Sequence, residues 1–228
     1  MKKLYAIVAA ACLAPLMWSD RASAQATYSL AVSRHPNVFA GQREEDIEQR
    51  VDKILAAASA MLQRADKPQG VACNVTLKRS GPVRLFASAN TPEDIKTKSD
   101  RDAVHQENFD SSIVNVKIVN SIGYCRPGAG MFRGCSWPHR FQSIIVTADS
   151  TTDDAKFPEL LWPHEFGHLT GLWHQKPFAS ALMSPCALIA TNVEVRKREC
   201  DCLLAGPGPG ACNGPEPSPP VTCPNSGH

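Results

Sequence analysis

The chain has 228 residues, of which 43% are hydrophobic and 20% charged, and its formal net charge is +2. This composition is ordinary for a globular protein, and the length suits one domain with a sizeable core, with or without short appendages. The small charge leaves no basic surplus, so we expect neither nucleic acid nor acidic lipid as a partner.

Residues 1–24 have the pattern of a secretory signal peptide. The charged pair Lys2-Lys3 precedes an apolar stretch, Leu4–Met17, that is too short for a standard membrane helix, and Ala22-Ser23-Ala24 is a small-residue cleavage site. A rival interpretation places a lipoprotein site at Ala9–Cys12, but it leaves a very short apolar segment. We therefore expect an exported protein, periplasmic or extracellular, with no membrane span in its mature part.

The first half of the mature chain predicts one long helix among short strands. The helix is clearest because apolar residues recur in Glu44–Ala65 at spacings of three and four, which gives one apolar stripe. Strands are predicted on either side of it, at Tyr28–Val32, Val71–Leu77 and Val83–Phe86. The polar segment Thr91–Phe109 is weakly periodic and is predicted to be a loop or a loose helix.

Two further strands are predicted, at Ile113–Val119 and Ser143–Thr147, and the second reads as a buried strand. The mixture of strands and helices favours an α/β or α+β layer structure. From residue 206 the chain is rich in proline and glycine and cannot build a core. We therefore predict a single folded domain over residues 25–205 and a tail over 206–228.

The cysteines predict a structure stapled by disulfides. One of the nine, Cys12, leaves with the signal peptide, and an even number in an exported chain is typical of disulfides. The candidates are Cys73, Cys125, Cys135, Cys186, Cys200, Cys202, Cys212 and Cys223. Their number leaves the pairing open, although the turn-forming residues between Cys125 and Cys135 favour that pair.

The last four cysteines, from Cys200 to Cys223, also permit a second hypothesis. They could form a zinc site of their own, but Cys200-Asp201-Cys202 lacks the usual C-x-x-C spacing. An exported protein also meets an oxidising compartment. We therefore favour disulfides for these residues.

Residues 164–174 read His-Glu-Phe-Gly-His-Leu-Thr-Gly-Leu-Trp-His. On a helix, His164 and His168 lie on the same face, so both can bind one metal ion. The adjacent Glu165 can approach a water on that ion, which is the H-E-x-x-H arrangement of zinc metallopeptidases.

Gly171 and His174 extend this site. Glycine tolerates the left-handed backbone that ends a helix and reverses the chain, so Gly171 can bring His174 to the same ion. Three neutral imidazoles leave one tetrahedral position for water, which is typical of a catalytic zinc. The remaining histidines have no partner at metal-binding spacing and are interpreted as surface or structural residues: His35, His105, His139 and His228.

This segment resembles the metzincin clan, whose signature is H-E-x-x-H-x-x-G-x-x-H followed by a Met-turn. The segment similar to that turn is Ala181-Leu182-Met183-Ser184-Pro185. Its sequence and its short distance from His174 most resemble the matrixin branch. The resemblance implies a metzincin-like twisted mixed sheet with a long N-terminal helix and a zinc-binding active-site helix. It also implies that Met183 lies beneath the metal.

Three departures from the metzincin pattern bear on these expectations. Pro185 stands where some metzincins carry a tyrosine near the metal, and no cysteine-bearing propeptide motif is present. Pro163 requires the zinc helix to begin near it, or to begin near Pro158 and kink.

By analogy, an edge strand binds substrate, for which residues 112–124 are the better candidate, and residues 187–190 wall the pocket for an apolar side chain.

These observations predict a secreted, zinc-dependent metalloendopeptidase with one Zn²⁺. His164, His168 and His174 are the expected ligands and Glu165 the general base, acting on a zinc-bound water. The substrate is expected to be a protein or peptide, and the chain to be a monomer. The alternative hypothesis is a secreted, zinc-stabilised binding or adhesion module that does not catalyse a reaction.

Overall fold

The computed structural model describes residues 25–125, 131–137, 142–151, 156–174, 180–184, 193–208 and 212. Its strands are β1 (Ala26–Arg34), β2 (Val75–Arg79), β3 (Arg84–Leu85), β4 (Asp94–Ile95), β5 (Val114–Val119), β6 (Ser121–Ile122), β7 (Gly134–Trp137) and β8 (Ser143–Thr147). Its helices are α1 (Glu44–Gln63), α2 (Lys98–Gln106), α3 (Lys156–Leu169) and α4 (Lys197–Ala205), with a short 3₁₀ helix, η1 (Asp149–Thr151).

A mixed sheet forms the centre of the fold. Its strand order is β2-β1-β5-β8-β7, with β3 also paired to β1. Every pairing in it is parallel except the one between β7 and β8, which is antiparallel. A second, two-stranded sheet joins β4 to β6. The α/β fold class and the twisted mixed sheet predicted from the sequence are therefore confirmed.

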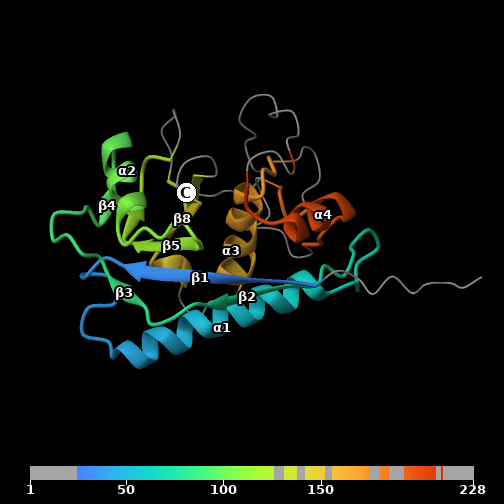
Figure 1. Cartoon of the computed structure of the whole chain (residues 1–228), viewed down its shortest axis with the longest axis horizontal. Helices are drawn as coiled ribbons and strands as arrows, with labels where there is room; N and C mark the ends of the chain where they lie inside the picture. The colour runs from blue at the N-terminus through green and yellow to red at the C-terminus, as the bar shows by residue number, and fades with distance from the viewer. Residues whose placement is uncertain are drawn as a thin grey trace, which may run out of the picture.

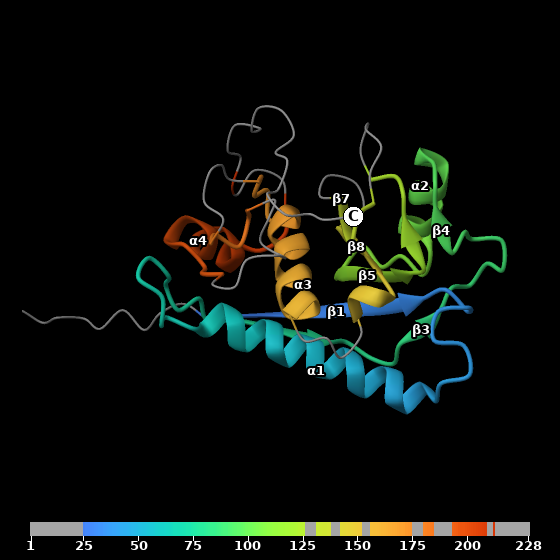
Figure 2. The ribbon, with the colours of Figure 1, turned by 180° about the vertical axis from the view of Figure 1, so that it is seen from behind.

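The two faces of the main sheet carry different layers. Helices α1 and α3 pack together on one face and enclose the larger hydrophobic cluster with residues of β1, β2, β5 and β8. On the other face a smaller cluster lies between the sheet, α2 and the β4–β6 pair. Figures 1 and 2 show α1 running alongside β1 and β2, with α3 between α2 and α4. The long helix predicted from its apolar stripe is confirmed, and the stripe faces the core.

The segment predicted to be the substrate-binding edge lies in the middle of the sheet. Within residues 112–124, β5 pairs with β1 on one side and β8 on the other, so the edge prediction was wrong. Asn115 and Lys117 alternate with apolar residues in this strand, and both are fully buried. The Asn115 amide, for example, donates to the backbone oxygen of Asp110 at 2.8 Å. Among the described residues, the ends of the sheet are β2 and β7.

Burial of Lys117 makes stability depend on pH. Its ammonium donates to the backbone oxygen of Glu107, and burial, aided by Arg84, lowers its pKa from 10.5 to about 7. Between pH 7 and 10.5 the unfolded chain therefore holds a proton that the folded chain has released. The free energy of unfolding should rise with pH in this range, by at most about 1.4 kcal/mol per unit from this group.

The Lys117→Met variant should lose this rise. Chemical denaturation of wild type and variant from pH 6 to 10.5 measures it, and Lys78→Met, at an exposed position of β2, is the matched control. Parallel stability curves for wild type and Lys117→Met would contradict titration of the buried lysine.

Residues 91–109 contain regular structure that the sequence interpretation underestimated. Helix α2 begins after Thr97, whose hydroxyl accepts the Asp100 N–H while the Asp100 carboxylate accepts the Thr97 N–H. This capping box satisfies backbone donors that would otherwise have no partner, and it offsets the poor helix propensity of the polar segment. The choice left open between loop and loose helix therefore resolves into β4 followed by a capped helix.

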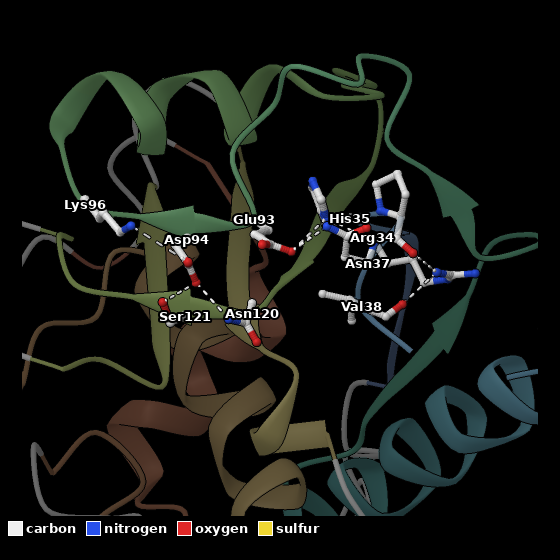
Figure 3. A network of polar contacts seen from close by, with 10 residues as sticks. Arg34, His35, Asn37, Val38, Glu93, Asp94, Lys96, Asn120 and Ser121 are labelled. Carbon is white, nitrogen blue, oxygen red and sulfur yellow. Dashed lines mark hydrogen bonds and ion pairs between the residues drawn. The ribbon is translucent and has the colours of Figure 1, made fainter. Parts of the chain in front are cut away.

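Polar contacts tie the end of β1 to the β4–β6 pair (Figure 3). The Asn37 amide donates to Glu93 at 2.9 Å, and the next residue, Asp94, accepts from Ser121 at 2.6 Å and Asn120 at 2.8 Å. The Ser121 and Asn120 donors hold the pKa of the Asp94 carboxyl below its ordinary value. The Asn37–Glu93 bond links the residues after β1 to the residue before β4, and the Asp94 contacts hold β4 to β6.

Three disulfides join described cysteines. Cys125 pairs with Cys135, as the intervening turn residues suggested, and the other pairs are Cys73–Cys200 and Cys202–Cys212. Because Cys200, Cys202 and Cys212 are oxidised, the second zinc site considered for them is excluded. Cys186 and Cys223 lie outside the described residues. Within the described part of the chain, none of the helices is both long and apolar enough to cross a membrane.

Candidate metal centre

Helix α3 carries the first two histidines of the motif. It begins at Lys156, so Pro158 falls in the first turn, where a missing backbone N–H removes no helical hydrogen bond. Pro163 lies inside the helix. Of the two starts that the sequence left open, the earlier one is therefore correct. The early start gives His164 and His168 a helical turn on their N-terminal side.

The three motif histidines converge. Their candidate ligand nitrogens all lie within 4.8 Å of one another. The His174 Nε2 atom is 3.2 Å from Nε2 of His164 and 3.2 Å from Nε2 of His168. A tetrahedral ion with bonds of about 2.0–2.1 Å separates its ligand atoms by about 3.3 Å, so the spacing fits zinc.

Backbone carbonyls set the tautomer of both helical histidines. The Nδ1 atom of His164 lies 2.7 Å from the Leu182 oxygen, and that of His168 lies 2.8 Å from the Leu172 oxygen. A carbonyl only accepts, so each Nδ1 must carry the proton, which leaves the Nε2 lone pair for the common centre. Partners of this kind orient the ligands of metal sites, and here they lie on two different turns.

The turn after α3 brings His174 back to the helix. Gly171 has a φ of +89°, in the left-handed region, and the Leu172 N–H bonds to the Gly167 oxygen at 3.1 Å. Backbone atoms of Cys212 lie 3.5–3.7 Å from the position that a Cβ of Gly171 would occupy. Cys212 is held there by its disulfide with Cys202 of α4. The start of the tail therefore packs on the turn that leads to the third histidine.

Met183 lies in a tight turn beneath the same helix. The turn is closed by the Ser184 N–H, which donates to the Ala181 oxygen at 3.0 Å. Met183 is fully buried, and a Cβ on Gly167 would lie 2.5 Å from its sulfur. The glycine inside the H-E-x-x-H segment thus leaves the space that the methionine fills.

Glu199 of α4 holds this turn in place and was not identified from the sequence. Its fully buried carboxylate accepts the Met183 N–H and the Arg196 N–H, each at 2.8 Å. Burial raises the pKa of the Glu199 carboxyl, while these backbone donors act in the opposite direction. The neighbouring Leu182 oxygen orients His164, so α4 connects to the cluster of three histidines through the turn.

Replacing Glu199 by alanine should destabilise the protein and loosen the turn. Each backbone N–H left buried without an acceptor costs about 1–3 kcal/mol. The exposed Asp201 on the same helix, which pairs with Lys197, is the control, and its alanine variant should change stability by less than about 1 kcal/mol. Chemical denaturation of the two variants measures the difference in their free energies of unfolding. Equal values would show that Glu199 does not stabilise the turn around Met183.

Glu165 faces the edge of the sheet. It is 6% exposed and lies against β7, where Ser136 donates to it and Gly134 approaches it closely. Sequence patterns gave no sign of these two partners, because β7 is short and distant from α3 in the chain. The other residues predicted to lie near the site, Pro185 and the pocket wall at 187–190, are outside the described residues, as are His139 and His228.

Comparisons with known proteins add one structural likeness. No family model matches the chain, and no curated protein matches its sequence. Among solved structures, the chain is similar to archaemetzincin from Methanopyrus kandleri, with 16% identity, a TM-score of 0.46, and coverage of 82% of this chain and 97% of that chain. No comparison supports the matrixin branch in particular.

Proposed function

We propose that this protein is a zinc-dependent metalloendopeptidase. The observation that carries the proposal is the convergence of three Nε2 atoms whose rings are oriented by backbone carbonyls or by a tight turn. Three neutral imidazoles are a ligand set that suits zinc and leaves an open position. His164, His168 and His174 would hold the ion, and Met183 would serve as the methionine of the Met-turn.

The chain's own groups provide the proton chemistry. When bound, zinc supplies a Lewis acid that lowers the pKa of water and polarises the scissile carbonyl. Glu165 accepts a proton from the attacking water and then donates it to the departing amine. Its position next to His164 in the motif, and its burial, support this role, because a buried carboxylate is shielded from bulk solvent.

The substrate would lie along β7. In the described part of the chain, β7 pairs with β8 on one side and with no second strand on the other, so it can accept an extended peptide by strand addition. Glu165 lies against this strand, which brings the proposed base next to the proposed peptide path.

We further propose that residues 1–24 direct export, which agrees with the three disulfides.

A library of peptides blocked at both ends tests this function. The zinc-loaded protein should cut these peptides internally, a chelator should stop the cleavage, and mass spectrometry identifies the products. Trimming of unblocked peptides alone would indicate an exopeptidase instead. Peptides that are retained but never cut would favour a zinc-stabilised binding module, and neither binding nor cleavage would contradict both.

A further inference from the structure

Gly134 and Ser136 of β7 both face Glu165. Residues two apart in a strand point to the same side, so the two positions form one surface. Ser136 is 4% exposed, and its hydroxyl donates to the Glu165 carboxylate and lies 2.9 Å from the Glu165 backbone oxygen. We refer to Gly134 and Ser136 as the Glu165 seat.

Gly134 is required for space rather than for backbone conformation. Its φ is not in the left-handed region, so other residues are open to it on backbone grounds. A Cβ at this position would lie 2.5 Å from Glu165 Oε1, 2.7 Å from Cγ and 2.8 Å from Cδ. No side chain fits there while Glu165 keeps its position. A glycine at position 134 is therefore needed for the Glu165 carboxylate to lie where it does.

We infer that the seat positions the Glu165 carboxylate for proton transfer, an inference that rests on the proposed function. A free glutamate side chain samples several rotamers, and proton transfer needs its oxygen at one place. The Ser136 hydroxyl fixes one carboxylate oxygen. Because Gly134 has no side chain, the carboxylate can lie directly against the strand. The seat lies on the strand proposed to bind the peptide, so the base is ordered before the substrate arrives.

A purely structural role for Ser136 makes a different prediction. Its hydroxyl also contacts the Glu165 backbone oxygen, so it could serve only to join β7 to α3. A bond of that kind affects unfolding but leaves turnover of the folded enzyme unchanged. A positioning bond affects kcat more than KM, because it acts on the reacting geometry and not on substrate binding.

Three serine variants separate these roles. Ser136→Ala should lower kcat about 10–100-fold, as for other residues that orient an active-site group, with KM and zinc content unchanged. Ser136→Thr keeps the hydroxyl and should restore most of the activity. The matched control is Ser143→Ala on the neighbouring strand, because Ser143 is equally buried and its hydroxyl has no hydrogen-bond partner among the described residues. Gly134→Ala should lower kcat as well, since it displaces the carboxylate.

A double-mutant cycle tests the contact without relying on activity. Thermal unfolding of the protein as purified is measured for Ser136→Ala, Glu165→Ala and the double variant, and the shifts should be non-additive. Unchanged kcat in Ser136→Ala, beside an inactive Glu165→Gln, would overturn the inference and leave the proposed function standing. If the wild type cleaves no peptide, the proposed function fails. Additive shifts in thermal unfolding would show in addition that Ser136 and Glu165 do not interact, and would overturn the inference about the seat.

Discussion

Replacing Glu165 by glutamine should remove peptide hydrolysis while the zinc stays bound. Glutamine nearly preserves the size of the side chain, but it has no basic oxygen to accept a proton. General acid–base catalysis contributes about 10²–10⁴-fold, and here one carboxylate serves both proton transfers, so the loss should reach at least this range. Cleavage rates of wild type and variant, matched for zinc content and thermal unfolding, measure it.

The control for this experiment is another glutamate of the same helix. Glu159 lies in α3, is partly exposed and precedes the motif, so Glu159→Gln should keep the wild-type rate. Equal rates for wild type and Glu165→Gln would contradict the mechanism and would point to a contaminating peptidase. A loss of zinc in Glu165→Gln would also count against it, because the three histidines are unchanged.

The His168→Ala variant should lose stoichiometric zinc. His168 contributes one of the two helical nitrogens, and its Nε2 atom lies 3.2 Å from that of His174, so its removal leaves an incomplete ligand set. Zinc should then no longer stabilise the fold. In a protein that binds it, a ligand at 1,000 times its dissociation constant contributes about 4 kcal/mol. Elemental analysis and thermal unfolding with and without added zinc measure both effects.

A second histidine variant distinguishes ligand loss from general destabilisation. His105 of α2 is fully buried, so His105→Ala leaves a cavity and should also lower stability. It should nevertheless keep one zinc per chain, since it is not one of the three converging histidines. A full zinc equivalent in purified His168→Ala would show that the ligand assignment is wrong.

Features set by nearby residues could be predicted from the sequence. The apolar stripe of α1 and the strand Ser143–Thr147 follow from local periodicity and composition. The convergence of the three histidines could also be predicted, because they lie in one helix and the turn after it. Even the helix α2 had a local signal in Thr97 and Asp100, although the polar character of the segment outweighed it.

Features set by distant residues could not be predicted. The place of β5 in the middle of the sheet depends on its pairing with β1 and β8, and Lys117 is buried although lysine is usually exposed. Glu199 reaches Met183 from α4, and Ser136 reaches Glu165 from another strand. Such contacts join residues that come together only when the layers pack. They therefore leave no local periodicity in the sequence from which they could be predicted.

Zinc titration into the metal-free protein tests whether peptide hydrolysis depends on one zinc ion per chain. The protein is stripped with a chelator, zinc is returned in steps, and cleavage of one blocked peptide is followed at each step. We predict no cleavage without metal, and a cleavage rate that rises in proportion to added zinc and stops rising at one equivalent per chain. Cleavage by the stripped protein, or a rate indifferent to added zinc, would contradict it.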